Sequence, residues 1–175
     1  MENIKIVQPT IEDTRGTIEV QYKAWLITYP NEKLGITVDD IEYRYKDAFS
    51  GERLKKREKI ITDPEPNEKY IIAKDGDKVI GMCYAKIQEN KNQLQAIYLL
   101  PDYQGKGVGT QLWNAVFPFF DEAMDIYVEV ADYNEKAISF YKKLGFVDTG
   151  RRFSDERFRM KSGAMLPEME MMKSR

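Results

Sequence analysis

The chain has 175 residues, with 27 lysine and arginine residues against 29 aspartate and glutamate residues, a formal net charge of −2. A single domain commonly has roughly 100–200 residues, so we expect one domain over residues 1–175. The hydrophobic content of 42% is enough for a core and argues against disorder. The balanced charge gives no support for nucleic-acid binding, which usually needs a basic face.

The chain contains no histidine. This absence excludes Ser-His-Asp and Cys-His catalysis, histidine-ligated zinc and HExxH metalloproteases. Acid–base chemistry must therefore use Tyr, Glu, Asp, Lys, the single Cys or water, and we expect no metal. Cys83 lies in the apolar run 79–85 and is interpreted as a buried small hydrophobe. With one cysteine, no signal-peptide pattern and no long apolar stretch, we expect a soluble cytoplasmic protein with no membrane partner.

The first third of the chain shows one short strand and then helical patterns. Residues 4–7 are expected to form the strand. Thr10-x-x-Asp13 and Thr37-x-x-Asp40 match capping boxes, so each is expected to begin a helix. Ser50-Gly51 is expected to end the second helix, and the densely charged residues 52–59 are expected to form a solvated helix or loop.

From residue 69 onward the periodicity changes to that of strands. Residues 70–73 and 79–87 flank Asp75-Gly76-Asp77, which is a strong hairpin signal. The remaining expected elements are a strand over 93–100, a helix over 107–120, a strand over 126–130, a helix that Asn134 caps and Leu144-Gly145 ends, and strands at 146–147 and 165–172. Strands that first meander and then alternate with helices predict an α/β (α+β) fold, with a mixed, mostly antiparallel central sheet of about six or seven strands flanked by helices.

The most informative segment is the glycine-rich turn Gln104-Gly105-Lys106-Gly107-Val108-Gly109, which joins an expected strand to an expected helix. Helix N-termini carry unpaired N–H groups that suit phosphate, and glycines let an anion approach the backbone closely. A dinucleotide-binding fingerprint is excluded because Thr110 stands where glycine or alanine is required, and the acidic partner is missing. A Walker A loop is excluded because Gly109 is not followed by Lys and Ser or Thr. An ordinary strand-to-helix turn stays the alternative.

A second segment, residues 134–146, is an Asn-initiated helix that ends at glycine and contains Phe140-Tyr141-Lys142-Lys143-Leu144-Gly145-Phe146. Together with the glycine-rich turn, it resembles the GNAT superfamily of acetyl-CoA-dependent N-acetyltransferases. The resemblance covers roughly residues 69–147 and implies the GNAT fold and acetyl-CoA as cosubstrate. The chain is also similar to bacterial spermidine/spermine acetyltransferases of the sporulation-regulator type.

The resemblance implies which residues bind acetyl-CoA. Those expected around its phosphates are Gln104, Gly105, Lys106, Gly107, Val108, Gly109 and Thr110. The strand residues Ile97, Tyr98 and Leu99 would pair with the pantetheine arm, and the Leu99 N–H would polarise the thioester carbonyl. Asn134 matches a pantetheine-binding position, and its other role, helix N-cap, is compatible with this one.

Tyr141 matches the general acid of the family. An amine would attack the thioester directly, and the phenol, with a pKa near 10, would give its proton to the departing thiolate, whose thiol has a pKa of about 8.5. No acyl-enzyme is needed, which fits a chain without an activated nucleophile. The alternative for Tyr141 is a core aromatic beside Phe140.

The base that removes the proton of the amine is not evident, because the strand over 93–98 carries no carboxylate. Glu89, Glu129 or a water relayed to Tyr98 or Glu129 are the hypotheses that the sequence offers.

For the acceptor, Tyr29, Glu32 and Glu129 are candidate residues, since aromatic rings and carboxylates suit a cationic amine. We expect a small-molecule amine, in particular a polyamine such as spermidine or spermine. The alternatives are a protein N-terminal or lysine acetyltransferase and a non-catalytic acetyl-CoA-binding regulator. The basic segment 151–161 is expected to be an exposed loop before the last strand.

Overall fold

The computed structural model describes residues 4–175, in which seven strands form one sheet with the order β1-β2-β3-β4-β5-β7-β6. The strands are β1 Ile4–Val7, β2 Glu68–Asp75, β3 Lys78–Ile87, β4 Asn92–Leu99, β5 Ile126–Ala131, β6 Val147–Ser154 and β7 Pro167–Lys173. Among these strands β4 and β5 run parallel, and every other neighbouring pair is antiparallel. The predicted mixed, mostly antiparallel sheet is confirmed.

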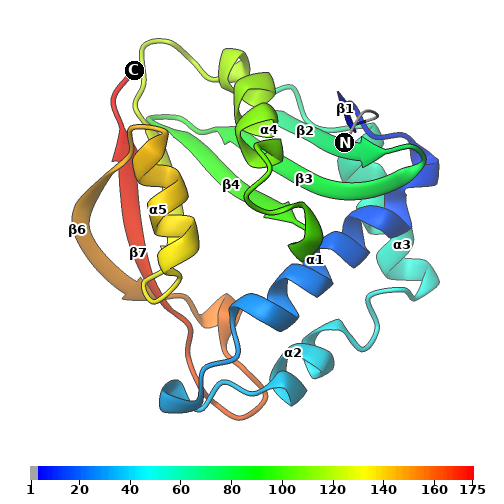
Figure 1. Ribbon diagram of the computed structural model, residues 1–175, viewed down its shortest axis with the longest axis vertical. Helices are drawn as coiled ribbons and strands as arrows, with labels where there is room; N and C mark the ends of the chain where they lie inside the picture. Colours follow the sequence, from blue (N-terminus) through cyan, green and yellow to red (C-terminus); the bar gives the residue numbers. More distant parts are fainter. Residues whose placement is uncertain (1–3) are drawn as a thin grey trace.

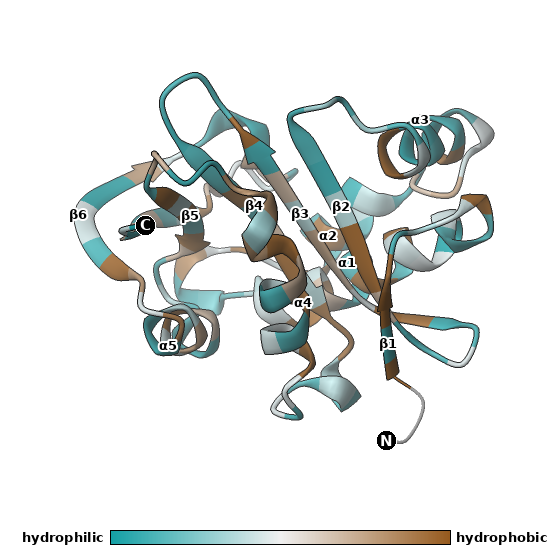
Figure 2. Cartoon of the chain, turned by 90° about the horizontal axis from the view of Figure 1, so that it is seen from above, coloured by the Kyte–Doolittle hydropathy of each residue, from teal (hydrophilic) through white to brown (hydrophobic). Residues whose placement is uncertain are grey.

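Helices cover both faces of this sheet (Figures 1 and 2). They are α1 Thr14–Thr28, α2 Val38–Tyr45, α3 Gly51–Thr62, α4 Val108–Val116 and α5 Glu135–Lys143. The N-terminal helices α1, α2 and α3 lie on one face, and α4 and α5 lie on the other (Figure 2). In the described part of the chain, no helix combines the length and apolar character needed to cross a membrane.

The two predicted capping boxes are both present. Thr37 accepts a hydrogen bond from the Asp40 N–H at 3.1 Å, and Asp40 accepts one from the Thr37 N–H at 2.9 Å, so α2 begins as expected. The box at Thr10 and Asp13 first forms the short 3₁₀ turn Ile11–Asp13, from which α1 continues. Hydrogen bonds between the backbone N–H groups at the helix start and side chains within three residues are enough to place these helix starts.

Two expectations for charged segments need correction. Ser50 does not end the second helix, because its hydroxyl accepts from the Arg53 N–H and caps α3, which contains the charged residues 52–59. The basic segment 151–161 is not all loop: its first four residues extend β6 to Ser154, where the strand pairs with β7. Backbone pairing with a neighbouring strand, which is not visible in a local pattern, overrides the polar composition there.

The core has two parts. The larger cluster includes residues of the sheet and of helices on both of its faces, with Ile80, Leu112, Ile126 and Met171 among its fully buried members. The smaller cluster lies beside α1 and α2 and includes Trp25, Tyr29 and Ile41. Tyr98 of β4 packs against both clusters, so this strand joins the two halves of the core.

Asp40 also ties α2 to the turn before β7. Its carboxylate accepts from the Ser162 N–H at 2.7 Å and from the Ser162 hydroxyl at 2.9 Å, and the residue is 3% exposed. Burial alone would raise the pKa of Asp40, but the hydrogen bonds from Thr37 and Ser162 lower it below its usual value. The charged form is therefore the one that the fold stabilises.

We expect Asp40→Ala to reduce the free energy of unfolding by about 1–3 kcal/mol, because it leaves buried donors unpaired and removes a cap. Asp39→Ala, at the exposed neighbouring position, should cost about 0.5 kcal/mol or less. Because the folded-state pKa of Asp40 is lowered, its stabilisation is complete above the unfolded pKa of about 3.9 and is lost as the pH falls further. Urea titrations from pH 7 to pH 3 should thus show the free energies of unfolding of the wild-type protein and Asp40→Ala converging at the acidic end. A difference that stays constant over this range would contradict this role of Asp40.

Candidate active site

The strands β4 and β5 are neighbours over a short distance only. They pair at Asn92 to Leu94 against Ile126 to Val128, and the ladder ends there, although β4 continues to Leu99. On its other side β4 has a bulge, since Tyr84 and Ala85 of β3 pair with Ala96 and Leu94 and leave Gln95 without a partner. A bulge bends and twists its strand. The second half of β4 therefore diverges from β5.

The register of β3 and β4 decides which backbone groups face this divergence. Leu100 donates its N–H to the Ile80 carbonyl at 2.9 Å. Hydrogen-bonded and non-hydrogen-bonded pairs alternate along an antiparallel ladder, so Tyr98 directs its backbone groups to β3, whereas Ile97 and Leu99 direct theirs to the β5 side. Of the three strand residues expected to meet pantetheine, two thus present their backbone on the open side.

The glycine-rich turn follows this strand. Gly105 has φ +72° and Gly107 has φ +81°, a region that residues with a Cβ avoid. Gly107 is the N-cap of α4, and the Gln111 N–H bonds to its carbonyl. The N–H groups of residues 108–110 therefore have no intrahelical acceptor and form the positive end of the helix dipole.

Close packing places this turn against β4 and α5. A Cβ at Gly109 would lie 3.2 Å from the Phe140 ring and 3.5 Å from the Leu99 side chain, so glycine lets α4 approach both elements. The Gln104 side chain donates to the Leu99 carbonyl at 3.4 Å. Lys106 is exposed, with its Nζ 5.7 Å from the Tyr103 ring centroid.

The helix α5 carries the other two predicted residues. Asn134 accepts from the Ala137 N–H at 3.1 Å, so its N-cap role is present. Tyr141 is 6% exposed, and its ring lies edge-on to Phe146 with 5.7 Å between centroids. Burial, and then the neighbouring Tyr98 and Cys83, raise the pKa of Tyr141 far above its usual value. Its phenol is therefore protonated throughout the pH range in which a protein acts.

Opposite Tyr141, α1 contributes an aromatic wall. The Trp25 Nε1–H donates to the Tyr98 hydroxyl at 3.1 Å, and the Tyr29 hydroxyl lies 3.5 Å from that of Tyr98. Tyr133 donates to the Tyr29 carbonyl at 2.8 Å and so joins α1 to the loop before α5. Burial raises the pKa of Tyr29 and of Tyr98, which keeps these phenols neutral.

Glu168 of β7 belongs to the same region, and the sequence did not single it out. It pairs across the sheet with Ala131, a member of the Trp25 and Tyr29 cluster, and it is 6% exposed. One of its carboxylate oxygens, Oε2, has no hydrogen-bond partner among the described residues. Burial, and then the charges of Glu129 and Asp155, raise the pKa of Glu168 to about 7.

The other carboxylates that the sequence offered as base or acceptor residues lie at different distances from this region. Glu129 is half-buried on β5, close enough for its charge to act on Glu168. Glu89 is exposed in the turn before β4, at the opposite end of that eight-residue strand from Leu99. At about 3.3 Å per residue, this separation is roughly 20 Å, so the structure removes Glu89 as a base. Glu32 is exposed on the 3₁₀ turn Glu32–Leu34, and its side chain has no hydrogen bond or ion pair within residues 4–175.

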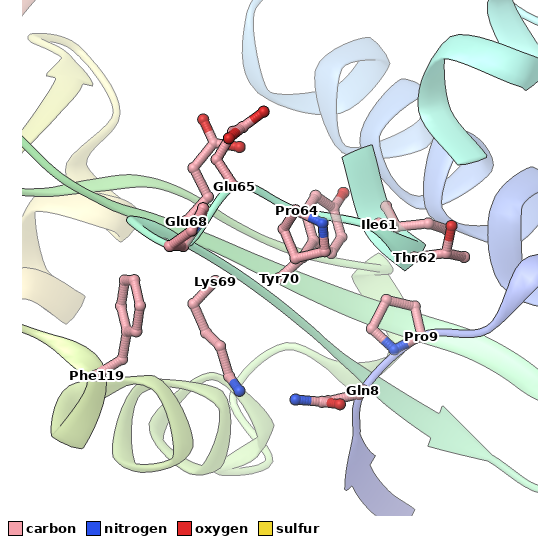
Figure 3. A pocket seen from close by; sticks show the side chains of 11 residues that line it. Gln8, Pro9, Ile61, Thr62, Pro64, Glu65, Glu68, Lys69, Tyr70 and Phe119 are labelled. Atoms are coloured by element: carbon pink, nitrogen blue, oxygen red, sulfur yellow. The ribbon is translucent and has the colours of Figure 1, made fainter. Parts of the chain in front are cut away.

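Two hollows on the surface of residues 4–175 lie elsewhere. One, of about 270 Å³, is lined by Gln8, Pro9, the end of α3 and the start of β2 (Figure 3). The other, of about 240 Å³, lies between the start of α1 and the β2–β3 turn. Neither is lined by a residue of the glycine-rich turn, by Tyr141 or by Glu168.

Two further kinds of site find no support in residues 4–175. No group of three or more His, Cys, Asp or Glu residues is arranged to hold a metal ion. Cys83 is fully buried, and burial raises the pKa of its thiol well above the usual value, so it is not a thiolate nucleophile.

The structure contains a strand that leaves its parallel neighbour, a glycine-rich helix start beside it and a buried tyrosine on the next helix, which is the arrangement that the resemblance to the GNAT acetyltransferases implies. The chain belongs to the acetyltransferase (GNAT) family, whose family model matches residues 38–146. This membership confirms the predicted enzyme class, an N-acetyltransferase, and supports acetyl-CoA as the cosubstrate.

Relatives with assigned activities differ in their acceptors. A spermidine N(1)-acetyltransferase of Thermoplasma acidophilum is 29% identical over 82% of this chain and 88% of its own length. A peptidyl-lysine N-acetyltransferase of Escherichia coli is 31% identical over 50% of this chain and 54% of its own length, so the match spans about half of that relative. The crystal structure of the PaiA N-acetyltransferase from Thermoplasma acidophilum in complex with coenzyme A superimposes with a TM-score of 0.74 at 24% identity, covering 99% of both chains.

Proposed function

We propose that this chain transfers the acetyl group of acetyl-CoA to a primary amine of a small polyamine such as spermidine or spermine. The observation that carries the proposal is the placement of three features around one gap: the outward-facing backbone of Leu99, the open start of α4 and the phenol of Tyr141. We also propose that the chain is similar to the bacterial spermidine/spermine acetyltransferases of the sporulation-regulator type.

For the cofactor, the N–H groups at the start of α4 and the backbone of residues 104–107 would hold the pyrophosphate. The pantetheine arm would continue along β4 and pair with the backbone of Ile97 and Leu99, beyond the point where β4 and β5 stop pairing. The Leu99 N–H would then point to the thioester carbonyl and stabilise the negative charge that develops on its oxygen.

For the chemistry, the amine nitrogen attacks the thioester carbonyl carbon and the C–S bond breaks. The products are an acetamide and the coenzyme A thiolate, which takes up one proton. Tyr141 is the group that donates this proton. Burial raises the pKa of Tyr141, and it would also raise the pKa of a coenzyme A thiol beside it, so the two pKa values would rise together.

For the acceptor, the aromatic residues Trp25, Tyr29 and Tyr98 and the carboxylates of Glu129 and Glu168 suit an elongated cation. The match to a spermidine acetyltransferase along most of the chain supports this choice over lysine acetylation, for which the matched relative is covered over half its length.

The deciding experiment measures thiol release from acetyl-CoA in the presence of spermidine, spermine, lysine-containing peptides, N-terminal peptides and aminoglycosides. Turnover with polyamines at least tenfold above the peptides supports the proposal. Peptide preference would favour the protein acetyltransferase. Binding of acetyl-CoA without turnover of any amine would favour a non-catalytic regulator and overturn the enzyme assignment of this site.

We predict that Gly107→Ala raises the Kd for coenzyme A about tenfold, because a Cβ at φ +81° distorts the α4 start that would hold the phosphates. Gly150→Ala is the matched control, since Gly150 has φ +84° on β6, apart from the turn. Both variants should lose about 1 kcal/mol of stability from the same backbone strain. Calorimetric titration with coenzyme A separates them; equal affinities would show that the turn does not bind the phosphates.

We predict that Tyr141→Phe lowers kcat about 100-fold and leaves the Kd for acetyl-CoA within about twofold, since only proton donation is lost. Tyr43→Phe, at an exposed position on α2, should retain wild-type activity. Steady-state kinetics with spermidine provides the comparison. A Tyr141→Phe enzyme with normal kcat would assign Tyr141 to packing alone.

A further inference from the structure

Two buried side-chain oxygens have no hydrogen-bond partner among the described residues, Gln93 Oε1 and Glu168 Oε2, and only the second belongs to a carboxyl group. Glu168 is 6% exposed, and its Oε2 has no hydrogen-bond partner among the described residues. An unpartnered polar atom or charge in such a place costs free energy. The next glutamate on the same face of β7 contrasts with it: Glu170 accepts from Arg151 at 2.8 Å and from the Thr149 hydroxyl at 3.2 Å.

The groups that act on Glu168 come from three other elements. The groups whose charges interact with Glu168 are Tyr98 of β4, Glu129 of β5, and Asp155 and Arg157 at the 3₁₀ turn Glu156–Phe158. Arg157 is committed to Asp155 in an ion pair, and its side chain is 72% exposed. The nearby cation is therefore neutralised by another carboxylate and does not satisfy Glu168 Oε2.

This environment is one that a cation from outside would complete. The charge of Glu168 acts on Tyr98, whose hydroxyl meets Trp25 and Tyr29, and the strand partner of Glu168, Ala131, belongs to the same cluster. A protonated amine held there would satisfy the free carboxylate oxygen and lie against aromatic rings. The net negative charge of Glu129, Glu168 and Asp155 against Arg157 favours such a ligand.

We propose that Glu168 is the general base of the transfer: its free carboxylate oxygen receives the proton of the acceptor ammonium group. The inference rests on the proposed acetyl transfer and adds the residue that the sequence left undetermined. Glu129 and Arg157 act as positioning residues that set the charge around Glu168.

The proton balance follows directly. The substrate ammonium R–NH₃⁺ loses one proton to the Glu168 carboxylate, and the neutral amine attacks the thioester. When the C–S bond breaks, Tyr141 gives its proton to the coenzyme A thiolate, and the phenolate that results takes up the second proton of the nitrogen, which restores Tyr141. Solvent then removes the proton from Glu168, so that the cycle releases one proton when the amine enters as ammonium.

Glu168 also has the acidity that this step requires. A carboxyl group with a pKa of about 7 is largely ionised at slightly alkaline pH and is a stronger base than an ordinary glutamate. A primary ammonium of pKa about 10.4 still holds its proton more tightly in water. Desolvation of the bound amine would lower the pKa of its ammonium group, the neighbouring carboxylates would raise it, and attack on the thioester consumes the neutral amine as it forms.

The test is the pH profile of kcat/KM with a polyamine substrate. Wild-type enzyme should show an acidic limb with an apparent pKa of about 7. Glu168→Gln should lose this limb and fall about 100-fold in kcat/KM at pH 7.5, with an unchanged Kd for acetyl-CoA. Glu170→Gln is the matched control on the same strand, and its profile should keep the wild-type limb.

Two charge variants test the assignment without touching the carboxylate. Glu129→Gln removes a negative charge and should move the limb to lower pH, whereas Arg157→Gln removes a positive charge and should move it to higher pH. Opposite shifts of about half a unit or more identify Glu168 as the titrating group even where Glu168→Gln fails to fold. Unmoved limbs in both variants would overturn the proposal.

The failure modes are distinct. If the wild-type enzyme acetylates no amine, the proposed function fails and the base assignment fails with it. If it acetylates polyamines and the Glu168→Gln enzyme keeps both the limb and the rate, only the base assignment is overturned.

Discussion

The parting of β4 from β5 is the constraint on which the site depends. Parallel strands that stay paired to their ends leave no backbone group free, and here the ladder stops after Leu94 and Val128. The bulge at Gln95 turns β4 away, and β5 finds its main partner in β7, with which it pairs along its whole length. The direction of the Ile97 and Leu99 backbone groups away from β3 is thus a consequence of how the sheet is assembled.

Side chains hold the divergence in place from both faces. On one face, Leu99 packs at Gly109, whose missing Cβ lets α4 and Phe140 approach. On the other face, Tyr98 fills the space between β4 and α1 and accepts the Trp25 N–H. Neighbouring residues of one strand point to opposite faces, so Tyr98 and Leu99 together fix β4 between the two halves of the core.

The local parts of this architecture were predictable from sequence. The capping boxes at Thr10 and Thr37, the hairpin at Gly76 and the Asn134 cap each depend on residues within a few positions, and all are present. The glycine-rich turn was identified for the same reason. What failed was also local: Ser50 was assigned to the end of one helix when it begins the next, because the same residue types serve both purposes.

Glu168 could not be identified from the sequence as a candidate site residue, because its surroundings are assembled from distant segments. In the run from Pro167 to Lys173, methionines alternate with glutamates, a pattern that predicts a strand with its glutamates in water. The face of Glu168 is instead covered, and the residues acting on it come from β4, β5 and the turn after β6. No spacing along the chain records these contacts.

The absence of histidine acquires a physical meaning from this arrangement. A group that exchanges protons near neutral pH needs a pKa near neutrality, and histidine has one without any help. A glutamate reaches the same range only when burial and like charges disfavour its ionised form, and the fold supplies both to Glu168. The same burial keeps the phenols of Tyr98 and Tyr141 protonated. In the proposed mechanism, one low-dielectric region therefore acts on both groups, because burial makes the Glu168 carboxylate more basic and keeps the Tyr141 phenol protonated.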